Sequence, residues 1–93
     1  MNIFNEEDDF LVTTPKANYF SISKNANQNI VEMEFEKVLE RLAVAEKLME
    51  DKGLEDEFEL VLNEMRAIGK MELEDRVNGL FLELAGNIVT QCE

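Results

Sequence analysis

Residues 30–53 read IVEMEFEKVLERLAVAEKLMEDKG, and this stretch decides the fold class. Its apolar residues recur at alternating spacings of four and three, from Val31 and Phe35 to Met49. Such a period places one continuous apolar stripe along an α-helix. Gly53 stands where a residue in the left-handed conformation commonly ends a helix. The stretch therefore predicts a long amphipathic helix that ends at Gly53.

Two further helices follow with the same apolar period. The second stripe consists of Leu54, Phe58, Val61, Leu62, Met65 and Ile68, and the third of Leu73, Val77, Leu80, Phe81, Leu84 and Ile88. Short connections usually make successive helices antiparallel neighbours. Residues 29–93 are therefore expected to form a helical domain, with three helices in an antiparallel arrangement. At Gly69-Lys70 a second possibility stays open, in which the last two helices continue as one bent rod.

Residues 1–28 show no sustained helical period, and we expect an extended arm or a short β-hairpin with a polar connector. Residues 10–13 are strand-like in composition, and residues 19–23 alternate as a half-buried strand does. Residues 14–18 between them, which include Pro15, are typical of a turn. Residues 25–29 form an Asn-rich connector that ends in a helix N-cap at Asn29. The whole chain is expected to be one structural domain.

Charge is the unusual feature of the composition. The 93 residues include 21 acidic and 9 basic ones, for a formal net charge of −12. A field of this sign repels nucleic acid and anionic membranes and attracts basic proteins. No apolar run approaches the roughly 20 residues that span a bilayer. The start of the chain lacks the pattern of a signal peptide, and Cys92 is the only cysteine, so we expect a cytoplasmic protein.

No catalytic or metal-binding constellation can be recognised in the sequence. The chain contains no histidine, which excludes Ser-His and Cys-His nucleophilic pairs and the commonest zinc sites. The acidic cluster at residues 6–9 lacks the spacing, the glycine and the closing glutamate of an EF-hand loop. We therefore expect a protein that is not an enzyme and that binds no cofactor or metal.

Acidic side chains form columns on the first two expected helices. The candidate partner-binding residues are Glu32, Glu36, Glu40, Glu55, Asp56 and Glu59. Like charges at i, i+4 spacing destabilise a helix by a few tenths of a kcal/mol per pair, so this pattern is unfavourable for the isolated chain. One interpretation is that these carboxylates act as phosphate-like charges towards a basic protein. The alternative is a solvated face that keeps the protein soluble.

Two other segments are candidates for contacts. On the third helix, opposite its main stripe, lie Gly79, Leu82, Gly86 and Val89. A helix that is small or apolar on this second face predicts a homodimer or higher oligomer, unless residues 10–23 cover the face. Before the helices, Phe10, Leu11 and Val12 form a candidate docking arm that adds a strand to a partner's sheet edge. The alternative is that they cap the helical core.

The function favoured by these features is a non-enzymatic acidic interaction protein that binds a basic surface of a partner, with a DNA-mimic inhibitor of a nucleic-acid-binding protein as one form. The alternative is a structural or chaperone-like helical subunit that acts through apolar surfaces and oligomerisation. Salt separates the two hypotheses, because it screens charge contacts and leaves apolar association intact.

Overall fold

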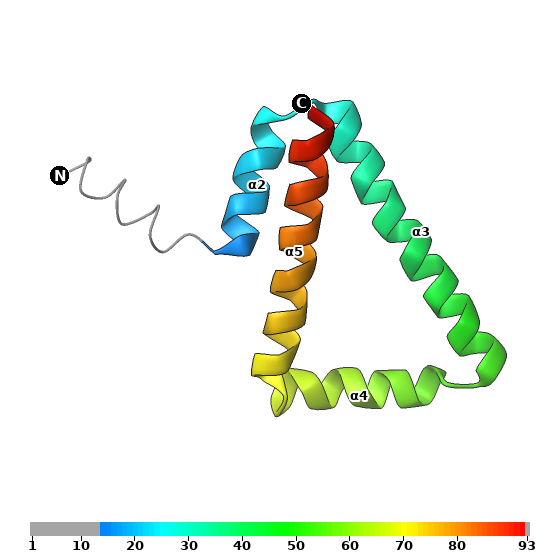
Figure 1. The fold of residues 1–93 in the computed structure, drawn as a ribbon. Helices are drawn as coiled ribbons and strands as arrows, with labels where there is room; N and C mark the ends of the chain where they lie inside the picture. Colours follow the sequence, from blue (N-terminus) through cyan, green and yellow to red (C-terminus); the bar gives the residue numbers. More distant parts are fainter. Residues whose placement is uncertain (1–13, 93) are drawn as a thin grey trace.

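The computed structural model describes residues 14–92, which fold into four α-helices joined by short connections (Figure 1). The helices are α2 (Pro15–Asn25), α3 (Gln28–Lys52), α4 (Glu55–Ala67) and α5 (Lys70–Cys92). No strand occurs among residues 14–92, so the expected mainly α class is confirmed for this part of the chain. The candidate docking arm at Phe10, Leu11 and Val12 lies outside the described residues.

Helix α2 occupies the segment for which we expected a turn and a strand. The strand expected at residues 19–23 is wrong, and the turn expected at residues 14–18 is the start of this helix. The Thr14 hydroxyl accepts a hydrogen bond from the backbone N–H of Ala17, and Pro15 follows it in the first turn. Threonine and proline in this order are as typical of a helix start as of a turn. The other expected strand, at residues 10–13, lies outside the described residues.

Helix α3 confirms the long amphipathic helix and its end point. It begins slightly earlier than expected, at Gln28, because Asn27 and not Asn29 is its N-cap. The Asn27 side chain accepts a hydrogen bond of 2.9 Å from the Asn29 N–H. Gly53 ends the helix with a φ of 67°, and its N–H and that of the next residue donate to carbonyl groups of the last turn. These are the two hydrogen bonds of a Schellman motif.

Helices α4 and α5 are separate, which decides between the two possibilities at Gly69. Helix α4 ends at Ala67 and α5 begins at Lys70 after a sharp change of direction (Figure 1). The N–H groups of Ile68 and Gly69 both donate to the carbonyl oxygen of Glu64, at 2.7 and 3.3 Å. These two hydrogen bonds end α4 before the chain changes direction.

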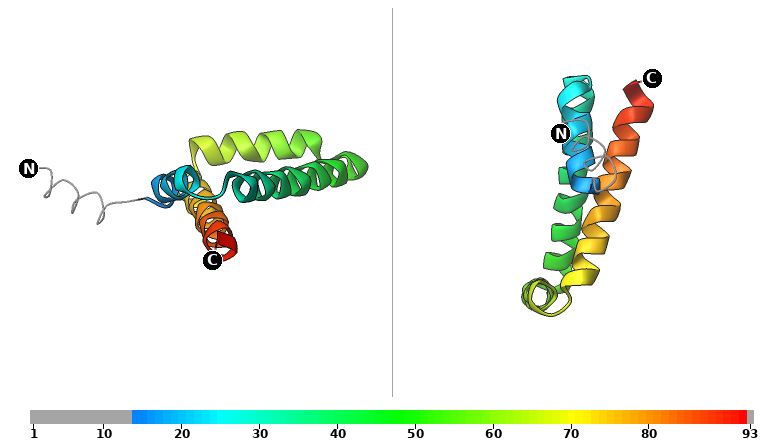
Figure 2. Two further views of the ribbon diagram at one scale, coloured as in Figure 1. Left: turned by 90° about the horizontal axis from the view of Figure 1, so that it is seen from above. Right: turned by 90° about the vertical axis from the view of Figure 1, so that its left-hand side faces the viewer.

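Helices α3, α4 and α5 form the three sides of an open triangle (Figure 1). The start of α3 meets the end of α5 at one corner, α4 spans the opposite side, and α2 lies along α5 on the outside. The molecule is thin, and its smallest extent of 14 Å is little more than the about 10–12 Å diameter of one helix (Figure 2). The expected side-by-side packing of the three helices is wrong, because short connections hold helix ends together without making the helices pack along their length.

The packed core is small and lies mainly between α2 and α5. Tyr19 and Phe20 of α2 meet Phe81 of α5, with ring centroids 5.5 and 6.0 Å apart. Ala85 and Ile88 of α5 are the only buried apolar residues of the described chain, with exposed fractions of 5% and 0%. The apolar stripes of α3 and α4 are therefore left largely uncovered.

Candidate interaction surfaces

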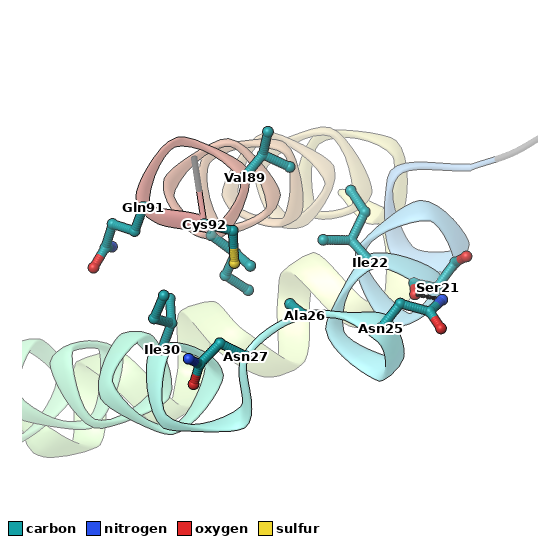
Figure 3. Close-up of a pocket in the computed structure, with 10 residues that line it drawn as sticks. Ser21, Ile22, Asn25, Ala26, Asn27, Ile30, Val89, Gln91 and Cys92 are labelled. Atoms are coloured by element: carbon teal, nitrogen blue, oxygen red, sulfur yellow. Dashed lines mark hydrogen bonds between the residues drawn. The ribbon is translucent and has the colours of Figure 1, made fainter.

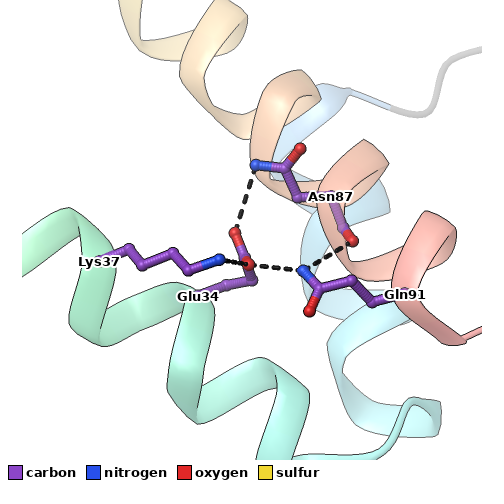
Figure 4. Close-up of polar contacts among 4 residues, drawn as sticks. All are labelled: Glu34, Lys37, Asn87 and Gln91. Carbon is purple, nitrogen blue, oxygen red and sulfur yellow. Dashed lines mark hydrogen bonds and ion pairs between the residues drawn. The ribbon is translucent and has the colours of Figure 1, made fainter.

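A polar cluster around the buried Glu34 closes the corner where α3 meets α5 (Figure 4). The Glu34 side chain of α3 is only 3% exposed. Its carboxylate accepts hydrogen bonds from Lys37 Nζ at 2.9 Å, from Gln91 Nε2 at 2.6 Å and from Asn87 Nδ2 at 3.2 Å. Asn87 and Gln91 lie one turn apart near the end of α5. The cluster thus joins two segments that are more than 50 residues apart in the sequence.

These contacts keep Glu34 charged. The hydrogen bonds from Lys37 and Gln91 lower the pKa of Glu34 below its ordinary value of 4.5, and the charge of Lys37 and the bond from Asn87 act in the same direction. Burial acts in the opposite direction, but its effect on the pKa is smaller than that of the hydrogen bond from Lys37 or from Gln91. The carboxylate therefore serves as a structural link between the two helices.

An apolar groove of about 600 Å³ lies next to this cluster, between α3 and α5. Its apolar lining consists of Val38, Leu42, Ala45, Val77, Leu80, Phe81 and Leu84. Several of these side chains are far from covered, including Leu42 at 49% and Leu80 at 59% exposure. Charged and amide side chains, among them Lys37, Arg41 and Asn87, form the polar part of the lining. A groove with an apolar floor and a polar rim suits an amphipathic helix better than a small polar substrate.

The four residues proposed for self-association remain open on α5. Leu82 is 57% and Val89 is 45% exposed. A Cβ atom added at Gly79 or Gly86 would meet no atom of the described chain within 4 Å. No described segment therefore makes a close approach at either glycine.

A second hollow, of about 750 Å³, lies where α2, α3 and α5 come together (Figure 3). Ile22 of α2, Ile30 of α3 and Val89 of α5 are among its apolar side chains, and Asn25, Asn27 and Gln91 are among its polar ones. Val89 is thus the one residue of the self-association set that borders α2 in this hollow. For residues 14–23, the alternative that the N-terminal segment covers the second face of α5 receives support at this position.

The six candidate partner-binding acids are all exposed. They are Glu32, Glu36 and Glu40 on α3 and Glu55, Asp56 and Glu59 on α4. None of them forms an ion pair with another residue of the range 14–92. Because each helical residue turns by about 100°, Glu36 and Glu40 lie about 160° around α3 from Val38, which lines the groove. The three acids of α3 and the three acids of α4 do not form one patch. About 18 Å of α3 separates Glu40 from the end of the helix, where the chain turns into α4.

A model of one protein family covers almost the entire sequence. The model, described as Domain of unknown function (DUF2018), matches residues 10–93. The chain belongs to the DUF2018 family. No curated protein and no solved structure matches it. The part of this DUF2018 chain that the family model spans includes the candidate docking arm as well as the four helices.

Within residues 14–92 of this DUF2018 chain, no helix combines the length and the apolar character needed to cross a membrane. The same residues contain no group of three or more cysteines and carboxylates placed to hold a metal ion.

The polar cluster of this DUF2018 chain is the feature that sequence reasoning missed. Glu34 lies three residues after Val31 and four before Val38, so it falls on the apolar stripe of α3. A carboxylate inside such a stripe is usually paired when it is buried. The position of Glu34 within the apolar stripe could have indicated a buried carboxylate. No sequence pattern indicates its partners Asn87 and Gln91 on α5.

Proposed function

We propose that this DUF2018 protein is a non-enzymatic helical subunit that acts as a homodimer, and that the outer faces of the dimer bind a basic surface of a partner protein. One observation carries the first half of this proposal. Within the described chain, 18 large apolar side chains are at least 38% exposed, whereas only two apolar residues are buried. Monomeric soluble proteins rarely expose contiguous apolar patches of more than a few hundred Å².

The number of exposed apolar residues is close to what an interface requires. A standard interface involves about 20–30 residues and buries about 800 Å² on each partner. The 18 exposed residues approach this number before any polar rim is included, and they lie on all four helices. They do not share one face, because Leu82 and Val89 lie on the side of α5 opposite the groove, so a partner that covers most of them has to span the triangle and reach around α5.

A second copy of the chain fits this requirement. It has the same size and the same thin shape, and it offers apolar faces of the same length. Two such layers placed face to face enclose a core between them, as in most domains. A twofold axis lets each copy cover on its partner the same residues that the partner covers on it.

The oligomeric state tests this half of the proposal. Light scattering should give a particle of twice the 10.7 kDa chain mass at micromolar concentration. Leu42→Glu, in the groove, and Leu82→Glu, on the second face of α5, should each give a smaller particle. Asn63→Glu adds the same charge at an exposed position of α4 opposite its apolar stripe and should leave the mass unchanged. A single 10.7 kDa species at high micromolar concentration would overturn the dimer.

The second half of the proposal concerns a basic partner. Its support is the set of six exposed carboxylates that have no ion-pair partner within residues 14–92. Complementary charge on another protein removes the repulsion within each column. One helix places a charge about every 6 Å, against about 3.4 Å along a DNA strand, and the two columns lie apart. This spacing favours a basic patch as the target over complete imitation of a duplex. Inhibition of a nucleic-acid-binding protein by DNA mimicry is a more specialised version of the same proposal.

The salt dependence of binding tests this half. With a purified basic partner, the association rate should fall steeply as ionic strength rises, because complementary charge mainly accelerates encounter. Each of Glu36→Lys and Glu59→Lys should weaken binding more than Glu93→Lys, with helix content unchanged. A rate that is independent of salt would remove the electrostatic proposal and leave the dimer untouched.

A further inference from the structure

A third groove lies where the starts of α2 and α5 approach the end of α4, and it shares Val77 and Phe81 with the apolar groove between α3 and α5. It has a volume of about 570 Å³. Lys16 of α2, Arg66 of α4 and Lys70 of α5 line it together, although up to 54 residues separate them in the sequence. Its apolar lining consists of Leu73, Val77 and Phe81 of α5.

Positive charge is concentrated at this groove in a chain that is otherwise acidic. Residues 14–92 contain 16 acidic and 9 basic residues, a net charge of −7, and three of those nine cations line this one groove. Glu74 is the only acidic residue of the lining, so the local balance is +2.

The three cations also lack counter-charges of their own. None of Lys16, Arg66 and Lys70 forms an ion pair with a carboxylate of residues 14–92, whereas Lys37, Lys47 and Arg76 do. Like charges held near one another favour an anion between them. Beside an apolar strip, this charge pattern fits a peptide that carries acidic and apolar side chains next to each other.

We propose that residues 6–12 of the same chain occupy this groove. This segment reads EEDDFLV, which is four carboxylates followed directly by three apolar residues. In the proposed contact the carboxylates lie against Arg66 and Lys70, and Phe10 and Leu11 cover the apolar strip. The contact needs only one chain, although it covers Val77 and Phe81, which also line the groove of the proposed dimer.

The path of the chain supports this occupant. Thr14, the first described residue, is itself part of the groove lining. The segment therefore starts at the groove, and its seven residues span at most about 25 Å when extended. A tether this short gives a high effective concentration, which favours the chain's own segment over the same segment of a second copy. The rest of the surface, with its excess of acids, repels the four carboxylates.

Paramagnetic broadening of NMR signals tests the contact directly. Cys92→Ser removes the only cysteine, and Asn5→Cys then provides a site for a nitroxide label that leaves all four acids in place. The amide signals of Lys70 and Leu73 should be strongly broadened at about 0.1 M salt and clearly less broadened at about 1 M salt, where charges are screened within about 3 Å and only the apolar part of the contact is left. The combined change Arg66→Glu and Lys70→Glu should abolish the broadening.

Two controls make the result specific. Lys24→Glu combined with Lys52→Glu makes the same charge change at two other lysines without ion pairs in residues 14–92, and it should preserve the broadening. A mixture of labelled chains with separate ¹⁵N-enriched chains should show none, since the contact lies within one chain. Broadening that appears in this mixture, that is the same at about 0.1 and about 1 M salt or that centres on other residues would overturn the proposal. The salt comparison needs no change in the groove, so it holds even if the charge-reversed variant fails to fold.

Discussion

Replacing Glu34 by glutamine is the most direct test of how the triangle is held closed. Glu34 is the one buried charged residue of the described chain, and it joins α3 to α5 through hydrogen bonds from Asn87 and Gln91, while a third bond comes from Lys37 of its own helix. Glutamine has the same shape and keeps one acceptor oxygen. Its NH₂ group, however, is a donor placed among the donors of Lys37, Asn87 and Gln91. The substitution therefore removes the charge and at least one hydrogen bond without creating a cavity.

The expected loss is moderate, because the partners are open to water. A hydrogen bond to a charged group contributes about 1.5–3 kcal/mol, and the larger values apply when the partner is left buried without another bond. The Lys37 side chain is 57% exposed and Asn87 and Gln91 are also exposed, so all three regain water when the carboxylate is lost. We expect Glu34→Gln to lower the free energy of unfolding by about 1–2 kcal/mol at pH 7.

The pH dependence of this loss identifies its cause. The pKa of Glu34 lies below 4.5 in the folded chain, chiefly because of the hydrogen bonds from Lys37 and Gln91. Unfolding returns it to its ordinary value, so the unfolded chain binds the proton more tightly. The stabilisation is therefore complete above about pH 4.5 and disappears as the pH falls through the folded pKa. Glu34→Gln has no such titration, so its difference from the natural chain should shrink in acid.

Thermal unfolding followed by circular dichroism provides the measurement, at one fixed protein concentration. For a chain of this size a loss of 1 kcal/mol lowers the melting temperature by about 4–8 °C. Glu46→Gln is the matched control, because Glu46 is an exposed residue of the same helix with no ion pair within residues 14–92. Equal melting temperatures for the two variants at pH 7, or a gap that stays constant down to about pH 3, would refute the reasoning.

Three further outcomes are expected. Gly53→Ala should lower the melting temperature, with a cost of about 1 kcal/mol, because the φ of 67° is unfavourable for any residue with a Cβ atom; an unchanged value would contradict this. Gly86→Leu should leave the helix content unchanged, because the position is open within the described chain. It should raise the dimer dissociation constant measured by sedimentation, and an unchanged constant would place the interface elsewhere. The melting temperature of the natural chain should rise with protein concentration, because dimer formation stabilises the folded state by mass action. At pH 7 it should also rise with added salt, because salt screens the repulsion among the excess acidic residues. A melting temperature that depends on neither would contradict both effects.

Helix ends that depend on the backbone conformation of a single residue could be predicted from the sequence. The end of α3 at Gly53 was predictable because a glycine after an apolar stripe suits the left-handed residue of a helix end. Helix α2 was not predicted, because Thr14-Pro15 starts either a turn or a helix and five residues with an alternating pattern are too few to decide. The packing of Tyr19 and Phe20 on Phe81 decides in favour of the helix, and these contacts join residues more than 60 positions apart in the sequence.

The arrangement of the helices lay beyond the sequence for a physical reason. An apolar stripe tells which face of a helix avoids water, but it does not tell what covers that face. In α3 and α4 the stripe is present and remains half exposed, with Leu42 at 49% and Phe58 at 41%. A three-helix bundle and an open triangle that packs on another chain therefore have the same pattern. For the same reason the groove at Lys16, Arg66 and Lys70 could not be predicted from the sequence, because these residues come together only in the folded chain.

The acidic outer face and the apolar groove act together on assembly in the proposed dimer. Glu36 and Glu40 lie on the side of α3 opposite Val38, so two copies that approach through their outer faces bring like charges together. Such contacts cost several kcal/mol across an interface, whereas copies that meet through the groove bury apolar side chains. Charge thus disfavours the wrong dimer while apolar surface stabilises the right one, which is how specific interfaces are commonly obtained. In this proposal, the face that repels a second copy is the face that stays free for the proposed basic partner.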